Sequence, residues 1–278
     1  MRCVITGDVQ RPGQQDNILR LYAVLGSLLA EAFGTWPELQ AGEPLEHEAW
    51  MQAYEAGPYP VMTDDLVIGF ELPPCARRTL PRWIDLRVHP VRFLDFRGPT
   101  AWNLFGLRSN VPGVEEAAAR FAVEVRRPKF DPVPGLRGAG VFTCQVQHDA
   151  SLLRDGRFIA PADVWPALVE WAARFPRVLV CPHPAEPEGP WPKTLLRDLP
   201  HAVAAPVPTY QALASVDAMC TVSSSTGVEA YYFNCEPTFL YRAPDAPPPV
   251  RLETPGLWHD IAAAIRRNEL HNASTDVR

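Results

Sequence analysis

Short apolar runs alternate with longer amphipathic stretches along most of the chain. The runs have the length of buried strands, and the longer stretches repeat apolar positions with helical spacing. Regular alternation of strands and helices predicts an α/β fold with parallel sheets. The predicted strands are residues 2–6, 66–70, 83–88, 141–146, 178–181, 202–204, 218–222 and 238–241, and the predicted helices are 18–33, 45–56, 114–125, 164–175, 210–215, 228–233 and 257–270.

The stretch at residues 126–140 divides this pattern in two. Its sequence, RRPKFDPVPGLRGAG, combines proline, glycine and charge in the way that is typical of a linker. The alternation of strands and helices restarts directly after it. The sequence therefore predicts two α/β domains, at residues 1–136 and 137–278.

Composition and charge exclude several classes of function. The 278 residues carry a formal net charge of −6, and their basic residues form only short clusters, so we expect no nucleic-acid partner. We expect a cytoplasmic protein, because the sequence shows no signal-peptide pattern and no apolar run long enough to span a bilayer. The six cysteines show no close pairing, which favours reduced, buried thiols over disulfides or a metal cluster.

One hydroxyl-rich turn is the most prominent feature of the second half. It contains Ser223, Ser224 and Ser225, follows the predicted strand 218–222 and leads into a helix. Free N–H groups and the positive end of a helix dipole suit an anion such as phosphate, and Glu229 in the first turn could then hold ribose hydroxyls. The alternative is structural, because Ser225 and Glu229 nearly fit the spacing of a capping box.

Polar residues also follow the strands of the first half. Glu71 comes directly after the strand at 66–70, where a carboxylate is a candidate acid or base or a solvated loop residue. His89 and Arg92 follow the strand at 83–88. They could contact an anionic sugar carboxylate or form a structural turn.

In the second half, two more strand ends carry candidate residues. Gln147 and Asp149 belong to a polar cluster after the strand at 141–146. His183 lies between two prolines directly after the strand at 178–181. The prolines fix the backbone around an imidazole that suits a phosphate or a leaving group, although the same pattern is compatible with an ordinary loop.

Four segments resemble one family of enzymes. The pair His183-Pro184 and SSS at 223–225 is similar to motifs of GT-B glycosyltransferases that use CMP-activated sugars, including bacterial sialyltransferases. GFELPP at 69–74 with WIDLRVHPVRFLDF at 83–96, and CQVQHDASL at 144–152, resemble the retaining β-Kdo transferases of capsule and lipopolysaccharide assembly. The resemblance implies the GT-B fold, in which two Rossmann-like domains face a cleft, and a CMP-β-Kdo donor.

The resemblance also implies which residues bind that donor. The serines at 223–225 would bind the CMP phosphate, and His183 would contact the same phosphate and ease its departure. Glu229 would hold the ribose. Gln147 and Tyr210 are further candidates for substrate binding.

For the reaction itself, the resemblance assigns Asp149 as the nucleophile and Glu71 as the carboxylate that handles the acceptor proton. His89 and Arg92 would shape the sugar pocket. Retention at an anomeric carbon through two displacements agrees with such a carboxylate pair. The resemblance implies neither a metal nor another cofactor. It implies a glycan or glycolipid acceptor. Such an acceptor is compatible with peripheral contact to the inner membrane or to a polysaccharide assembly complex.

Two alternatives remain open from the sequence. The chain could transfer another CMP-activated nonulosonic acid, such as a sialic acid. It could also be a non-catalytic nucleotide-sugar-binding subunit of a polysaccharide assembly complex.

Overall fold

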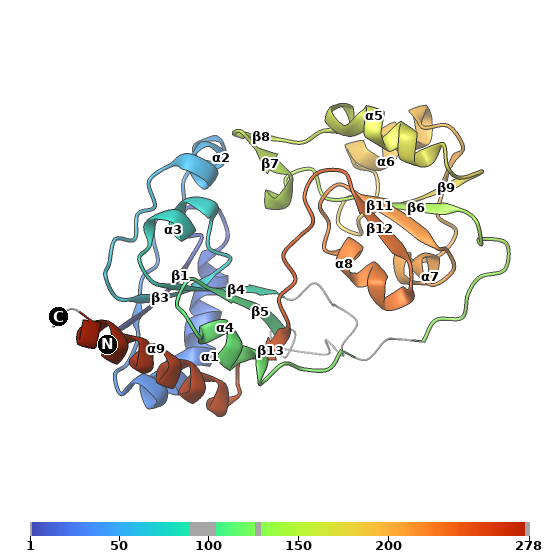
Figure 1. Cartoon of the computed structure of the whole chain (residues 1–278). Coiled ribbons are helices and arrows are strands. Elements are labelled where there is room, and N and C mark those ends of the chain that lie inside the picture. Colours follow the sequence, from blue (N-terminus) through green and yellow to red (C-terminus); the bar gives the residue numbers. More distant parts are fainter. Residues whose placement is uncertain (1, 89–103, 126–128, 276–278) are drawn as a thin grey trace. The chain divides into compact units, whose positions relative to one another are not determined.

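The computed structural model describes residues 2–88, 104–125 and 129–275, which form two compact units (Figure 1). Of these residues, unit 1 contains 2–88, 104–124 and 246–275, and unit 2 contains the rest. The prediction of two α/β domains with parallel-rich sheets is confirmed. The predicted boundary needs correction, because the chain returns to unit 1 at residue 246.

The predicted linker also belongs largely to unit 2. Leu136 and Ala139 are buried in its core, and the Val133 N–H donates to Ser215 Oγ at 2.8 Å. The sequence could not show this, because a stretch rich in proline and glycine can pack on a domain as well as connect two. The change of unit therefore lies near residue 125, and not at 136.

Unit 1 contains a six-stranded sheet in the order β13-β5-β4-β3-β1-β2. Its strands are β1 (Cys3–Gly7), β2 (Glu38–Leu39), β3 (Leu66–Phe70), β4 (Trp83–Val88), β5 (Leu104–Ser109) and β13 (Pro249–Arg251). The first four are parallel, while β5 and β13 pair antiparallel at one side. The order β2-β1-β3-β4 reverses between β1 and β3, so the carboxyl ends of these two strands flank a topological switch point.

The helices of unit 1 are α1 (Gln15–Phe33), α2 (His47–Ala56), α3 (Pro74–Thr79), α4 (Val114–Ala119) and α9 (Pro255–Thr275). Figure 1 shows α9 beside α1 and α4. Leu21 and Leu25 of α1 are buried in one core with Leu257 and Trp258 of α9. The closing helix is therefore part of the core of unit 1.

Two segments of unit 1 differ from the prediction. The sequence predicted no helix at 74–79, yet Pro74 occupies the first turn of α3, where its missing N–H costs nothing. The helix predicted at 114–125 ends at Ala119. Beyond it, the Val123 N–H donates to Pro249 O at 2.8 Å, so pairing with β13 replaces helical hydrogen bonds.

Unit 2 contains a fully parallel five-stranded sheet in the order β10-β9-β6-β11-β12. Its strands are β6 (Gly140–Thr143), β9 (Val178–Cys181), β10 (Ala202–Ala204), β11 (Ala218–Thr221) and β12 (Glu236–Phe239). In chain order this is 3-2-1-4-5, the order of a Rossmann sheet. The switch point lies between β6 and β11.

Helices cover both faces of this sheet. They are α5 (Pro161–Ala172), α6 (Pro190–Asp198), α7 (Thr209–Leu213) and α8 (Thr226–Ala230), with the 3₁₀ segments η2 (Ala150–Leu152) and η3 (Tyr231–Phe233). A two-stranded hairpin, β7 (Leu153–Arg154) and β8 (Arg157–Phe158), follows η2. The buried side chains form one core with α5 and α6 and a second with α7 and α8. This double winding confirms the Rossmann-like prediction for the second half.

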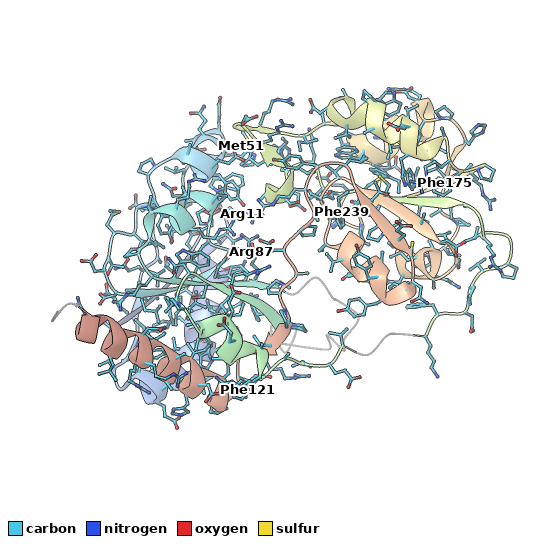
Figure 2. All side chains as sticks on the ribbon, in the orientation of Figure 1. Arg11, Met51, Arg87, Phe121, Phe175 and Phe239 are labelled. Carbon is cyan, nitrogen blue, oxygen red and sulfur yellow. The ribbon has the colours of Figure 1, made fainter. Side chains whose placement is uncertain are left out.

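Close packing in unit 2 requires a small residue at the start of α8. Phe239 of β12, labelled in Figure 2, lies against Gly227. A Cβ atom at Gly227 would come within 2.5 Å of the Phe239 ring. The glycine of the hydroxyl-rich turn therefore lets α8 approach β11 and β12 closely.

Two further observations bear on the composition. All six cysteines are free and buried, as the sequence predicted. No helix within the described ranges is both long and apolar enough to cross a membrane.

We predict that α9 contributes strongly to the stability of unit 1. Leu257→Ala should lower the free energy of unfolding by about 2–5 kcal/mol, because the Leu257 side chain is fully buried (0% exposed). Guanidinium unfolding measures this change, and hydrogen exchange should show that amides of β1 and β3 lose protection.

Leu270→Ala on the same helix is the matched control, because Leu270 is 73% exposed. It should change the free energy of unfolding by no more than about 0.5 kcal/mol. Equal effects of the two variants, or a loss of protection in β6 and β9 in place of β1 and β3, would contradict the assignment of α9 to unit 1.

Candidate functional site

In unit 2, a buried glutamine connects the two strand ends at the switch point. Gln145 follows β6, and Ser223 follows β11; both are buried. Gln145 Oε1 accepts the Ser223 N–H at 2.8 Å, and Gln145 Nε2 donates to Ser223 Oγ at 3.2 Å. Nε2 also donates to Ser151 Oγ at 2.9 Å. One side chain therefore joins three segments at the edge where open α/β sheets bind ligands.

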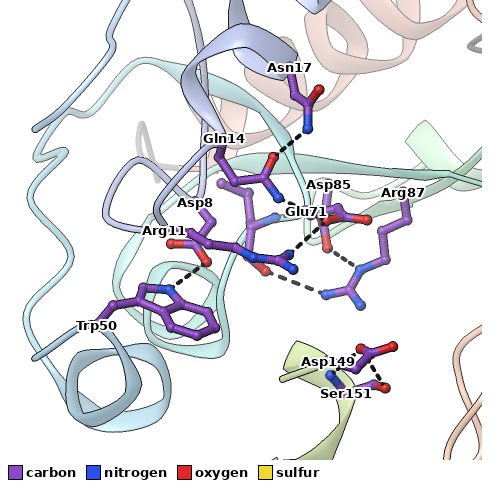
Figure 3. Close-up of polar contacts among 11 residues, drawn as sticks. Asp8, Arg11, Gln14, Asn17, Trp50, Glu71, Asp85, Arg87, Asp149 and Ser151 are labelled. Carbon is purple, nitrogen blue, oxygen red and sulfur yellow. Dashed lines mark hydrogen bonds and ion pairs between the residues drawn. The ribbon is translucent and has the colours of Figure 1, made fainter. Parts of the chain in front are cut away.

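Asp149 is attached to this cluster through Ser151. Its Oδ1 atom accepts hydrogen bonds from the N–H and the Oγ of Ser151, both at 2.9 Å (Figure 3). Within the described ranges, the second oxygen, Oδ2, has no hydrogen-bond partner. A carboxylate with one fixed oxygen and one available oxygen can act as a nucleophile.

The loop after β9 is tied to the loop of Asp149. Gln147 donates its backbone N–H to Glu186 Oε2 at 2.9 Å, and the Glu186 N–H donates to His183 O, also at 2.9 Å. His183 Nδ1 accepts the Ala185 N–H at 3.1 Å. A neutral imidazole whose Nδ1 accepts a hydrogen bond carries its proton on Nε2, so His183 can donate from that atom.

The three predicted serines differ in their surroundings. Ser223 is 3% exposed, and its Oγ atom contacts Ser151 O at 3.0 Å and Ser151 Oγ at 3.1 Å. Ser224 Oγ accepts the Thr226 N–H at 3.2 Å, and Ser225 makes no side-chain cap bond at the start of α8. Ser223 is thus committed to the fold, while Ser224 and Ser225 are half-buried and accessible.

Glu229 and Tyr210 form a hydrogen-bonded pair. Tyr210 Oη donates to Glu229 Oε2 at 3.0 Å, and the Tyr210 ring stacks on Phe233. Glu229 is 1% exposed, so it offers no exposed oxygen to a ribose in this state. The alternative interpretation as a capping box with Ser225 is wrong, because Ser225 makes no side-chain cap bond and Glu229 accepts from Tyr210. The helix predicted at 228–233 consists of the end of α8 and the 3₁₀ segment η3, which continues it to Phe233.

In unit 1, two carboxylates flank the switch point between β1 and β3. Asp8 follows β1 and Glu71 follows β3. Asp8 is 2% exposed, and its Oδ2 atom accepts the Trp50 indole N–H at 3.0 Å (Figure 3). The pKa of Asp8 is raised to about 6. Burial is the main cause, and its effect outweighs the Trp50 hydrogen bond and the nearby Arg11 charge, which both lower the pKa.

Glu71 lies at the same edge but is partly exposed. Its Oε2 atom is 3.4 Å from both Arg11 Nη1 and Gln14 Nε2, at the long end for hydrogen bonds. Glu71 also has a positive φ of 50°, which is uncommon for a residue with a side chain. A carboxylate held in this way by a cation and an amide can exchange a proton with a bound hydroxyl group.

A buried ion pair fixes the turn that carries Glu71. Asp85 of β4 is completely buried, and its Oδ1 atom accepts the Leu72 N–H at 2.8 Å. Arg87 Nε donates to Asp85 Oδ2 at 2.9 Å (Figure 3), and Arg87 Nη2 donates to Leu72 O at 3.4 Å. The pair thus holds the residue after Glu71 against β4.

The structure brings some of the predicted site residues together within one unit, whereas others lie in the other unit or outside the described residues. Asp149 and His183 belong to connected loops of unit 2, and Ser223 contacts Ser151, which bonds to Asp149. Glu71 belongs to the separate cluster of unit 1. His89 and Arg92 lie outside the described residues.

Sequence reasoning missed two polar residues of these clusters, Asp85 and Gln145. A weak signal existed for both. Asp85 lies inside the apolar run WIDLRV and Gln145 inside the predicted strand 141–146, and a polar residue within such a strand suggests a buried partner. No His, Cys, Asp or Glu residues gather as a metal site in the part of the chain that the structure describes.

Both units therefore place polar side chains at the switch point of a parallel α/β sheet, as ligand-binding proteins and enzymes of this fold class do. The chain is similar to two solved structures of KpsC from Thermosulfurimonas dismutans. The one named β-Kdo 2,7 transferase has 14% identity and a TM-score of 0.43, with 94% of this chain and 90% of that chain covered. The one named β-Kdo 2,4 transferase has 15% identity and a TM-score of 0.45, with 95% and 90% covered. No protein-family model and no curated protein sequence matches the chain.

We predict that Asp8 makes stability depend on pH between about 4 and 6. Its pKa is raised from 3.8 to about 6 on folding, so the folded state binds the proton more tightly. The contribution of Asp8 to stability is present below pH 4 and is lost as the pH rises to 6. A shift of about two pKa units corresponds to about 3 kcal/mol.

Asp8→Asn should remove this dependence, because an amide can still accept the Trp50 N–H. The free energy of unfolding of the variant, relative to the natural protein, should therefore be higher at pH 7 than at pH 4. Urea unfolding of both proteins at the two pH values measures the difference. Parallel pH profiles would show that Asp8 does not titrate in this range.

Proposed function

We propose that this protein is a retaining glycosyltransferase that transfers Kdo from CMP-β-Kdo to a glycan acceptor in surface polysaccharide biosynthesis. The observation that carries the proposal is the presentation of Asp149. One of its oxygens is fixed by Ser151 at a sheet switch point, in a loop bonded to that of His183. The motif CQVQHDASL, which contains Asp149 and Ser151, is also among the segments that resemble retaining β-Kdo transferases.

In the first displacement, Asp149 Oδ2 attacks the anomeric carbon of the donor sugar. A carbon–oxygen bond forms to the carboxylate, and the bond to the phosphate oxygen breaks with its electron pair leaving on CMP. The fixed Oδ1 atom keeps the carboxylate oriented, so little rotational freedom is lost when the bond forms. This first inversion yields a sugar ester of Asp149.

The leaving phosphate needs hydrogen-bond donors rather than a proton. His183 can donate from Nε2, and Ser224 and Ser225 are the accessible hydroxyls of the turn after β11. In this proposal Ser223 shapes the turn, because its hydroxyl is enclosed by Gln145 and Ser151. Donors aimed at developing charge contribute strongly to catalysis in a site that excludes water.

In the second displacement, an acceptor hydroxyl attacks the same carbon and the ester bond to Asp149 breaks. Glu71 takes the hydroxyl proton, and the Asp149 carboxylate leaves with the bonding electron pair. This second inversion at the anomeric carbon restores the starting configuration. The Arg11 guanidinium and the Gln14 amide, each 3.4 Å from Glu71 Oε2, hold the carboxylate in place for this step. Glu229 would reach the ribose of CMP when the Tyr210 hydroxyl turns away from it.

The nucleotide preference tests the donor assignment. We expect CMP, among CMP, UMP, UDP, GDP and ADP, to give the only clear rise in melting temperature. At about 100 times the dissociation constant, a ligand that binds only the folded state adds about 2.7 kcal/mol of stability. Asp149→Asn should show the same rise, since its amide oxygen can still accept from Ser151, but it should transfer no Kdo from CMP-Kdo.

Asp155→Asn is the matched control, because Asp155 lies in the exposed β7–β8 turn and its side chain is 84% exposed. It should retain full transfer. A rise with UDP or GDP and none with CMP would overturn the donor. CMP binding without transfer by the natural protein to any acceptor would instead indicate a nucleotide-sugar-binding subunit, and transfer of only another CMP-activated nonulosonic acid would correct the sugar.

A further inference from the structure

Gln145 uses both ends of its side-chain amide inside the protein. Its oxygen accepts the Ser223 N–H at 2.8 Å, while its nitrogen donates to Ser151 Oγ at 2.9 Å and to Ser223 Oγ at 3.2 Å. The residue is 4% exposed. A buried amide group left without partners is costly, so these contacts fix the side chain in one orientation.

The direction of the hydrogen bonds leads to Asp149. Since Gln145 Nε2 has only hydrogens to offer, Ser151 Oγ must accept from it. The Ser151 hydroxyl hydrogen is then available for Asp149 Oδ1, which lies 2.9 Å away and can only accept when ionised. The amide of Gln145 therefore orients the Ser151 hydroxyl toward the carboxylate.

The same amide also fixes the serine turn. By accepting the Ser223 N–H, Gln145 fixes the backbone two residues after the end of β11. Ser224 and Ser225, the accessible serines, follow directly. One side chain thus links the loop of Asp149 to the turn that holds the phosphate-binding candidates.

We propose that Gln145 and Ser151 are positioning residues for sugar transfer, with Gln145 acting on Asp149 through the Ser151 hydroxyl. This inference rests on the proposed function of Asp149 as the nucleophile. Neither residue touches the reacting atoms. Ser151 holds Asp149 Oδ1 so that Oδ2 is presented in one orientation, and Gln145 keeps the hydroxyl of Ser151 in the donating rotamer.

A set of four variants tests the order of this relay. Ser151→Ala removes the hydroxyl at an exposed position, and Ser151→Thr retains it. Gln145→Met keeps the approximate length of the side chain without its amide, and the double variant combines Gln145→Met with Ser151→Ala. Gln52→Met in α2 is the matched control, because Gln52 is exposed.

Ser151→Ala should lower kcat about 100-fold with little change in the KM for CMP-Kdo or in CMP affinity, since a misplaced reacting group can cost about that factor. Ser151→Thr should restore most of kcat. Gln145→Met should lower kcat to a similar extent and also weaken CMP binding, because the serine turn loses its anchor. Gln52→Met should behave as the natural protein does.

The double variant decides whether the two residues act in series. If Gln145 acts through Ser151, the double variant should have the kcat of Gln145→Met alone, within about a factor of two. Losses of kcat that multiply in the double variant would overturn the relay. An unchanged kcat in Ser151→Ala would overturn it as well.

Hydrogen exchange separates this inference from the proposed function. Gln145→Met should speed exchange at the amides of residues 149–152 and 223–225, whereas Ser151→Ala should do so only at 149–152. If the natural protein transfers no sugar, the proposed function fails, yet this exchange pattern would still support the link between the loops. Unchanged exchange in both segments would overturn the link.

Discussion

Parallel strand pairing constrains where polar side chains can gather in this protein. In each unit the sheet is covered by apolar cores, and polar residues appear where parallel strands end and the strand order reverses. At that point the connections before and after the switch leave on opposite faces, so the loops diverge and leave room for a ligand. Asp8 and Glu71 occupy this position in unit 1, and Gln145 and Ser223 occupy it in unit 2.

The polar clusters of unit 1 and unit 2 offset the free-energy cost of burying polar groups in different ways. In unit 2, Gln145 and Ser223 bond to each other and to Ser151, so a neutral network stabilises the loops and passes its orientation to Asp149. In unit 1, Asp8 is a buried carboxylate, and its raised pKa shows that the Trp50 hydrogen bond and the Arg11 charge only partly offset the loss of water. Rigid support is thus strongest around the proposed nucleophile.

The sequence predicted the regular part of the fold well. Hydrophobic periodicity placed β3, β4, β9 and β10 at the bounds that the structure shows. For β3 and β9 the reason is that a fully buried strand needs an uninterrupted apolar run. It failed where tertiary pairing decides the conformation. The return of the chain to unit 1 after residue 245 depends on β13 joining β5 and on α9 packing against α1 and α4, contacts that no local pattern encodes.

The candidate site was predictable only in part for a similar reason. Strand ends and short motifs indicated Asp149, His183 and Glu71, since polar residues after apolar runs stand out. The residues that orient these side chains do not stand out in the sequence in this way. The local sequence gives only a weak signal that Gln145 is buried and does not show what it bonds to, because its partner Ser223 lies 78 residues away along the chain.

The most direct test of the central claim is to identify the residue that carries the sugar during transfer. Glu71→Gln should slow the second displacement, so that the sugar ester accumulates when the variant is incubated with CMP-Kdo. Peptide mass spectrometry should then find one Kdo on the peptide that contains Asp149, and Asp149→Asn combined with Glu71→Gln should carry none. Kdo transfer with no adduct on Asp149, or an adduct on another residue, would contradict the proposed mechanism.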